Sequence, residues 1–191
     1  MSKEDHAYHV DTLLNTALEK LRREAPGYKV RNAVENDIDR IIEINMVSLP
    51  EHYPRSFFMD LYENYSKAFY VAESPSGEIV GYVMTRIEWK PGFTRRLLAR
   101  SGHVVSIAVL SEHRGRGLGY ALMAHAMHSM YYHYKCSETY LEVRVSNTPA
   151  ISLYEKLGYR KVKIEKGYYL DGEDAYVMAR GLPAILINNS P

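Results

Sequence analysis

The segment Arg114–Gly119 reads Arg-Gly-Arg-Gly-Leu-Gly and has the residue types of a turn that binds phosphate. It follows an apolar run, residues 104–110, and it opens a stretch of helical composition, residues 117–134. Glycine lets the main chain approach an anion without a Cβ atom in the way, and a helix points its unpaired N–H groups and positive dipole end at the same place. The pattern predicts a phosphate group bound at this turn, with added positive charge from Arg114 and Arg116.

Two common phosphate motifs do not fit this turn. A dinucleotide fingerprint needs a third glycine three residues after the second, but Tyr120 stands three residues after Gly117 and Leu122 three after Gly119. A Walker loop needs Gly-Lys followed by Ser or Thr, which the sequence lacks. The ligand should be a different phosphate-bearing cofactor, unless the segment is an ordinary glycine-rich loop with two solvated arginines.

Groups that can transfer protons occur at three further places. Glu142 alternates with Leu141 and Val143, so on a strand it faces away from those apolar side chains. His103 begins the neighbouring predicted strand, and Glu51 lies in a predicted loop. Each could equally be an ordinary strand or loop residue, and the residue types alone leave that open.

Apolar periodicity and turn residues predict the elements that position these groups. A helix over residues 5–25, with Val10, Leu14, Ala17 and Leu21 on one face, would cover the main domain or pair with a second copy. Strands are predicted at residues 28–33, 68–72, 79–87, 102–110, 139–145, 159–165 and 175–180, and helices at residues 36–48, 54–65, 117–134 and from Asn147 onward. This order is a mixed α/β plan.

Composition narrows the class of protein. The chain has 191 residues, of which 46% are hydrophobic and 25% charged, as expected for one globular domain with a sizeable core. A net charge of +1 argues against a protein made mainly to bind nucleic acid. The single cysteine, Cys136, has no internal disulfide partner, the first residues are polar rather than signal-like, and no apolar run is long enough to span a membrane. We therefore expect a soluble, cytoplasmic protein.

The spacing Arg114-x-x-Gly117-x-Gly119 after a strand resembles the acetyl-CoA signature of the GNAT superfamily of N-acetyltransferases. Residues 147–159 are similar to the second cofactor segment of that family. Residues 49–54 and 167–176 resemble the protein N-terminal acetyltransferases, in particular the archaeal relatives of the NatA catalytic subunit, while bacterial RimI-type enzymes share the two cofactor segments.

This resemblance implies the GNAT fold, which is a central mixed sheet of about seven strands flanked by about four helices. It implies a GNAT domain over residues 28–181, with an added helical extension at 1–27 and a tail at 182–191. The implied cosubstrate is acetyl-CoA. By resemblance, the residues that would bind it are Ile107, Ala108, Val109, Arg114, Gly115, Arg116, Gly117, Leu118, Gly119, Asn147 and Tyr154.

The resemblance also implies catalytic roles. Tyr154, two helical turns after Asn147, would be the general acid that protonates the leaving thiolate. The general base would be Glu142 with His103 through a water molecule or, in second place, Glu51. Main-chain N–H groups of residues 107–109 would stabilise the oxyanion. The peptide groove would be lined by Leu49, Pro50, Glu51, Tyr53, Tyr168 and Tyr169. No metal site is expected, although His103 and Glu142 could capture zinc adventitiously.

The predicted reaction is direct acetyl transfer to the α-amine of a protein N-terminus, without a covalent enzyme intermediate. Deprotonating an α-amine at pH 7 costs about 1.4 kcal/mol and a lysine about 4.6 kcal/mol, so a weak base suffices for the first. A lysine acetyltransferase and a non-catalytic CoA-binding scaffold are the alternatives. Besides protein N-termini, a ribosome could dock on a predicted basic loop, residues 89–102 with Lys90, Arg95, Arg96 and Arg100, or the chain could self-associate.

Overall fold

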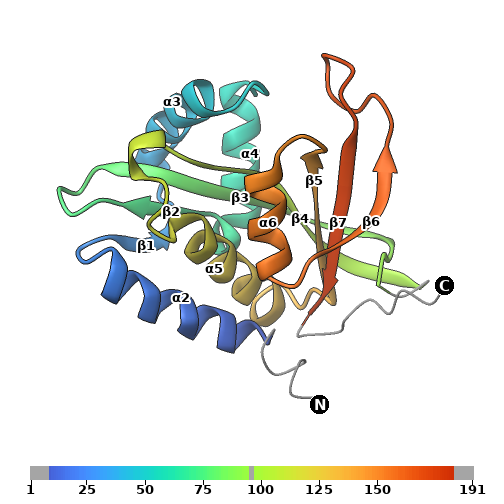
Figure 1. Cartoon of the computed structure of the whole chain (residues 1–191), viewed down its shortest axis with the longest axis horizontal. Coiled ribbons are helices and arrows are strands. Elements are labelled where there is room, and N and C mark those ends of the chain that lie inside the picture. The colour runs from blue at the N-terminus through green and yellow to red at the C-terminus, as the bar shows by residue number, and fades with distance from the viewer. Residues whose placement is uncertain (1–8, 95–96, 183–191) are drawn as a thin grey trace.

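The computed structural model describes residues 9–94 and 97–182. These residues form one seven-stranded sheet in the order β1-β2-β3-β4-β5-β7-β6 with helices on both faces (Figure 1). The strands are β1 (Lys29–Asn32), β2 (Tyr70–Glu73), β3 (Ile79–Pro91), β4 (Leu98–Val109), β5 (Glu138–Arg144), β6 (Arg160–Glu165) and β7 (Ala175–Gly181). The helices are α2 (Val10–Glu24), α3 (Ile38–Ser48), α4 (Arg55–Tyr65), α5 (Leu118–Tyr132) and α6 (Thr148–Lys156). The predicted mixed α/β order is confirmed.

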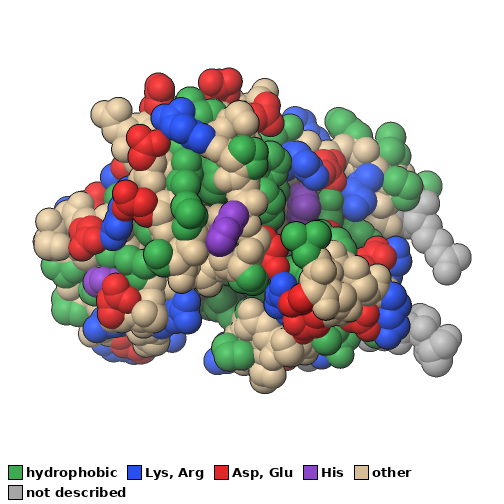
Figure 2. All heavy atoms as spheres, turned by 90° about the horizontal axis from the view of Figure 1, so that it is seen from above, with side chains coloured by type: hydrophobic (Ala, Val, Ile, Leu, Met, Phe, Trp, Pro, Cys, Tyr) green, Lys and Arg blue, Asp and Glu red, His purple; other side chains and the backbone are tan. Residues whose placement is uncertain are grey.

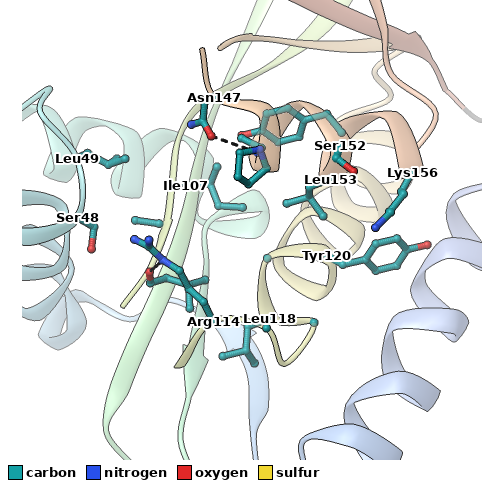
Figure 3. A pocket seen from close by; sticks show the side chains of 18 of the residues that line it. Ser48, Leu49, Ile107, Arg114, Leu118, Tyr120, Asn147, Ser152, Leu153 and Lys156 are labelled. Carbon is teal, nitrogen blue, oxygen red and sulfur yellow. Dashed lines mark hydrogen bonds between the residues drawn. The ribbon is translucent and has the colours of Figure 1, made fainter. Parts of the chain in front are cut away.

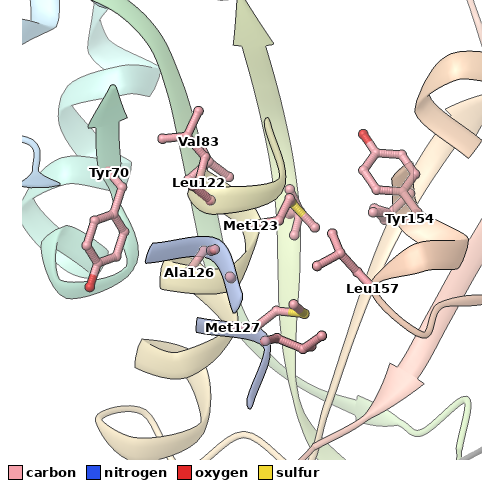
Figure 4. Packing of buried hydrophobic residues seen from close by; sticks show 14 of the residues in the cluster. Tyr70, Val83, Leu122, Met123, Ala126, Met127, Tyr154 and Leu157 are labelled. Atoms are coloured by element: carbon pink, nitrogen blue, oxygen red, sulfur yellow. The ribbon is translucent and has the colours of Figure 1, made fainter. Parts of the chain in front are cut away.

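Two apolar clusters hold the helices on the sheet. On one face, α3 and α4 bury Ile41 and Phe58 against β3. On the other, α5 lies under the centre of the sheet, where Leu122 and Met123 pack with Val83 of β3 and Leu157 (Figure 4). Helix α5 has almost no polar face, so it is stable only when it is buried all round. The sheet covers one side of it, and neighbouring helices cover the other.

Helix α2 covers α5 within the same chain. The predicted helix was 5–25; it begins at Val10 in the structure, and residues 1–8 lie outside the described part. Four apolar residues of α2 are buried in the core cluster around α5, and they are Val10, Leu13, Ala17 and Leu21. Leu13 is thus buried where Leu14 was expected, and Leu14 is partly buried beside it, because positions three and four residues after Val10 both fall on the same side of the helix.

The prediction of a loop over residues 89–102 is wrong for residues 89–91 and 98–102, which belong to strands. Strands β3 and β4 continue as a long hairpin in which Trp89 pairs with Arg100 and Pro91 with Leu98. The strands were predicted from apolar alternation to end at residue 87 and to begin at residue 102. Pairing between them continues past these points. Arg95 and Arg96, which were part of the predicted basic loop, lie outside the described residues.

Strands β4 and β5 separate at the middle of the sheet. They are parallel neighbours over only three residue pairs, which end at His103 opposite Tyr140. Just beyond, β4 has an irregularity at Val105, since Met84 pairs with Ser106 and Thr85 with Val104. A bulge bends the strand that contains it and ends regular pairing. The sheet therefore opens between β4 and β5, next to the candidate site residues.

The limits of the described part affect three expectations. The tail predicted at 182–191 lies outside it from residue 183 onward, so the domain boundaries stay predictions. Across residues 9–94 and 97–182, no helix is both long and apolar enough to cross a membrane. Over the same residues there is no cluster of three or more His, Cys, Asp or Glu side chains arranged to hold a metal ion.

Candidate functional site

Two cavities meet in the opening between β4 and β5. We call the first the glycine-turn cavity; it has a volume of about 480 Å³ and extends from Arg114 to α6 (Figure 3). The second, the tyrosine cavity, has about 460 Å³ and lies between β4, β5 and the loops before α4 and β7. Side chains that line both are Ser48, Leu49, Ile107, Asn147, Ala150 and Tyr154. Two ligands bound in these cavities would therefore meet beside Tyr154.

The turn before α5 has the backbone geometry that an anion needs. Gly115 and Gly117 have φ of 75° and 79°, the left-handed region that favours glycine. A Cβ atom on Gly115 would meet nothing within 4 Å, so the turn is open on that side. The first main-chain hydrogen bond of the helix is donated by Ala121 N–H to the carbonyl of Gly117. The N–H groups of Leu118 and Gly119 in the first turn have no acceptor within the helix and can bind phosphate oxygens.

The two arginines of the turn differ in position. Arg114 lines the glycine-turn cavity and donates from Nε to the carbonyl of Val109 at 2.8 Å. Arg116 donates from Nη1 to the carbonyl of Glu112 at 2.7 Å, and its guanidinium lies 5.9 Å from the ring centre of Tyr28. The structure therefore brings Arg114 to the cavity and not the side chain of Arg116.

Strand β4 offers main-chain donors along the same cavity. Leu110 N–H donates to the carbonyl of Val80 in β3 at 2.9 Å. Since successive N–H groups of a strand point to opposite edges, those of Ile107 and Val109 point to the edge that β5 has left. Of the three residues expected to supply an oxyanion donor or cofactor contact, Ile107 and Val109 have the suitable direction.

Helix α6 places Tyr154 between the cavities. Its N-cap is Asn147, whose Oδ1 accepts from Ala150 N–H at 3.2 Å, and Pro149 lies in its first turn. Tyr154 is only 6% exposed, and burial raises its pKa above the usual tyrosine value. The phenol is thus neutral at physiological pH and able to donate its proton.

Glu142 and His103 lie side by side in the opening. His103 donates from Nε2 to Glu142 Oε2 at 2.6 Å, and its ring is stacked on Tyr140 with ring centres 4.4 Å apart. The hydroxyl of Tyr140 in turn donates to Glu88 at 2.5 Å. Glu142 lines the tyrosine cavity, whereas His103 stands behind it. The carboxylate therefore faces the tyrosine cavity, and the imidazole holds it in place.

Glu51 is bound to an arginine. Arg144 donates from Nη2 to Glu51 at 2.6 Å, and from Nη1 to Asp171 and Glu173 at 2.7 Å each. Its guanidinium also lies 4.0 Å from the ring centre of Tyr169. The guanidinium of Arg144 thus ties Glu51 to the loop before β7, and this contact favours Glu51 as a positioning group.

All six residues expected to line a peptide groove contribute to the tyrosine cavity, and they are Leu49, Pro50, Glu51, Tyr53, Tyr168 and Tyr169. Burial, with the nearby charge of Glu142, raises the pKa of Tyr168 to about 12, so its hydroxyl stays neutral. Neutral phenols can both donate hydrogen bonds to a peptide main chain and accept them from it.

The surface seen from above shows acidic and basic side chains interspersed over the molecule (Figure 2).

Sequence reasoning missed several residues of the site. Arg144, which lines the tyrosine cavity, and Lys20 and Lys156, which line the glycine-turn cavity, are not among the predicted site residues. Their positions depend on tertiary packing rather than on a local pattern. The alternation along β5 was the one available signal for Arg144, because it places that residue on the face of Glu142.

Comparisons with known proteins agree with this geometry. The model of the acetyltransferase (GNAT) family matches residues 38–159. The chain is 54% identical over 157 residues to an N-alpha-acetyltransferase of Saccharolobus solfataricus, covering 81% of this chain and 93% of that protein. It is 37% identical to the N-terminal acetyltransferase A complex catalytic subunit NAA10 of Arabidopsis thaliana, over 80% of this chain and 77% of the relative. The crystal structure of Ard1 from Thermoplasma volcanium superposes with a TM-score of 0.69 at 28% identity, covering 81% of this chain and 97% of that one.

Proposed function

The chain belongs to the acetyltransferase (GNAT) family, and from this premise we propose that it transfers acetyl from acetyl-CoA to the α-amine of protein N-termini. The observation that supports this most is the meeting of the two cavities at Tyr154. A phosphate-bearing thioester carrier in one cavity and a peptide in the other would present their reactive groups to the same phenol. Acetyl-CoA is the acetyl donor.

The glycine-turn cavity suits acetyl-CoA. The amides that open α5, with Arg114, would hold the diphosphate, and Gly115 leaves room for it. The N–H groups of Ile107 and Val109 would pair with the amide-bearing arm of the carrier and with the thioester oxygen. The thioester then lies at the junction of the two cavities, beside Tyr154.

Acetyl transfer needs two proton movements in opposite directions. Glu142, directly or through a water molecule, accepts a proton from the peptide ammonium, and His103 positions the carboxylate. The amine nitrogen attacks the thioester carbon, and main-chain N–H groups of β4 stabilise the oxyanion. The C–S bond breaks, Tyr154 donates its proton to the thiolate, and the nitrogen loses its second proton to solvent. Exchange with water then returns Glu142 and Tyr154 to their starting protonation states, so one proton is released in each turnover. The products are an acetylated N-terminus and CoA.

Arg144 provides a test of substrate positioning. Replacing it with glutamine removes the cation shared by Glu51, Asp171 and Glu173, so the loops on both sides of the tyrosine cavity lose their connection. We expect KM for the peptide to rise about tenfold, as for loss of a charged hydrogen bond, with a smaller change in kcat. Steady-state kinetics checks this, with Arg55→Gln, which breaks an exposed pair with Asp39, as the control. An unchanged KM would remove Arg144 from substrate positioning.

The choice of amine is tested with two matched peptides. One has a free α-amine and a blocked lysine, and the other has a blocked α-amine and a free lysine. We expect acetylation of the first at least about a hundredfold faster at pH 7, because the lysine ammonium costs about 3 kcal/mol more to deprotonate. Acetylation of the lysine peptide alone would favour the lysine acetyltransferase alternative. CoA binding without turnover of either peptide would favour the scaffold alternative.

The wider setting of the enzyme is also a proposal. Protein N-termini are its substrates, and a cytoplasmic location would give access to them. Contact with a ribosome and self-association remain predictions. The β3–β4 hairpin exposes the apolar side chains of Trp89 and Leu98, which are available for such a contact.

A further inference from the structure

Three basic side chains line the glycine-turn cavity, and they are Lys20, Arg114 and Lys156. None of the described residues that line this cavity is an aspartate or glutamate. Like charges gathered around the positive end of a helix repel one another unless an anion lies between them. Arg114 alone can make one contact with a diphosphate, and the cavity has two further cations, Lys20 and Lys156. A ligand with additional phosphate charge therefore fits the site better.

Lys20 is the unexpected member of this set, because it comes from α2. The family model begins at residue 38, so α2 precedes the part of the chain that the family defines. Figure 3 shows α2, drawn in blue, beside Tyr120 and Lys156 at one end of the cavity. An element outside the family core thus adds a charge to the site.

The position of Lys20 is fixed by the packing of α2 on α5. The buried side chains of Ala17 and Leu21 flank Lys20 along the helix. At the other end of α2, Asp11 accepts from the hydroxyl of Tyr132 at 2.7 Å and lies 3.2 Å from His128 Nε2. Both ends of α2 are therefore anchored, and Lys20 projects from a rigid support.

The side chain of Lys20 lies against the glycine turn itself. A Cβ atom on Gly117 would lie 3.2 Å from Cε of Lys20 and 3.3 Å from Cδ. Only glycine at this position allows such close contact together with φ of 79°. The aliphatic part of Lys20 thus crosses Gly117, the N-cap residue of α5, and brings its ammonium close to the amides that open this helix.

The ammonium of Lys20 has only a weak partner among the residues that the structure describes. It forms an ion pair with Glu24, four residues along the same helix, at 3.6 Å. Both side chains are about two-fifths exposed, at 42% and 39%. Such surface pairs are weak, and a doubly charged phosphate can compete with them.

We propose that Lys20 binds a phosphate group of acetyl-CoA, so that the N-terminal helix completes the cofactor site. This inference rests on the proposed function, since it assigns a ligand to the cofactor cavity. The phosphate is either the diphosphate held by the turn or the phosphomonoester on the ribose of the carrier, and the two are separable with analogues.

Calorimetric titration of the full chain with CoA tests the proposal. We expect Lys20→Met to raise Kd about fivefold, the effect of one partly exposed ion pair, and Lys20→Arg to restore it to within about twofold. Arg22→Met removes an exposed charge from the same helix and should leave Kd unchanged. The melting temperature of each variant should match that of the wild type, because Lys20 is not part of the core. In turnover, Lys20→Met should raise KM for acetyl-CoA and leave kcat unchanged.

Dephospho-CoA identifies the phosphate. If Lys20 contacts the ribose phosphate, the fivefold difference disappears with dephospho-CoA; if it contacts the diphosphate, the difference persists. Either result supports a phosphate contact. Equal Kd values of wild type and Lys20→Met for CoA would overturn the proposal and leave the proposed function intact. Absence of CoA binding by the wild type would instead refute the proposed function.

Discussion

Replacing Tyr154 with phenylalanine is expected to lower kcat by about a hundredfold to a thousandfold, while Kd for CoA changes less than about twofold. The substitution removes one hydroxyl and keeps the ring that packs at the junction of the two cavities. Without the phenol, the thiolate leaves unprotonated or takes its proton from water, and the barrier rises. Single-turnover rates together with calorimetric Kd values measure the two effects separately.

The raised pKa of Tyr154 gives this prediction a pH signature. Burial raises the pKa, so the phenol remains protonated through and above the normal tyrosine range near 10. The wild-type kcat should therefore not fall between pH 7 and about 9.5 through loss of this proton.

Tyr159→Phe is the matched control for Tyr154→Phe. The ring centre of Tyr159 is 6.0 Å from that of Tyr154, Tyr159 is also buried, and its hydroxyl pairs with Thr139. Equal rates for wild type and Tyr154→Phe would remove the phenol from the mechanism.

Replacing Glu142 with glutamine is expected to lower kcat/KM at pH 7 by about a hundredfold or more. Glutamine has nearly the same shape and can still accept from His103 Nε2, so the loss reflects the missing base rather than a collapsed site. The defect should shrink as the pH rises from 7 to 9, because the peptide α-amine, with a pKa of about 8, then loses its proton to solvent. A pH profile of kcat/KM measures this.

Glu51→Gln distinguishes the two candidate bases. Because Glu51 is paired with Arg144, its loss should act mainly on KM for the peptide and should show no recovery at high pH. His103→Gln should give an intermediate loss of rate, as expected for a residue that positions the base. If Glu51→Gln had the larger effect on kcat, with recovery at high pH, the base assignment would be reversed.

Local patterns made part of this site predictable. The glycine turn, Asn147 and Tyr154 are each defined by spacing within one turn or one helix, and the structure places all of them at the glycine-turn cavity. The face of Glu142 followed from alternation along one strand. Such features depend on a few neighbouring residues, so they can be read before the tertiary fold is known.

Other features depend on contacts between distant parts of the chain. Arg144 meets Glu51, which precedes it by 93 residues, and Asp171 and Glu173, which follow it by 27 and 29. The contact of Lys20 with Gly117 exists only because α2 packs on α5. Arg116 turns away from the cavity because its guanidinium donates to the carbonyl of Glu112. The β3–β4 hairpin is longer than predicted because the two strands continue to pair. Residue type alone specifies neither feature.

A conjugate of CoA joined through an acetyl group to the α-nitrogen of a short peptide tests most directly whether the two cavities form one reaction centre. We expect it to inhibit competitively against both acetyl-CoA and peptide and to bind more tightly than CoA or the peptide alone, because it occupies both cavities and joins at Tyr154. Inhibition that is competitive against acetyl-CoA but noncompetitive against peptide would place the peptide elsewhere and would contradict this account.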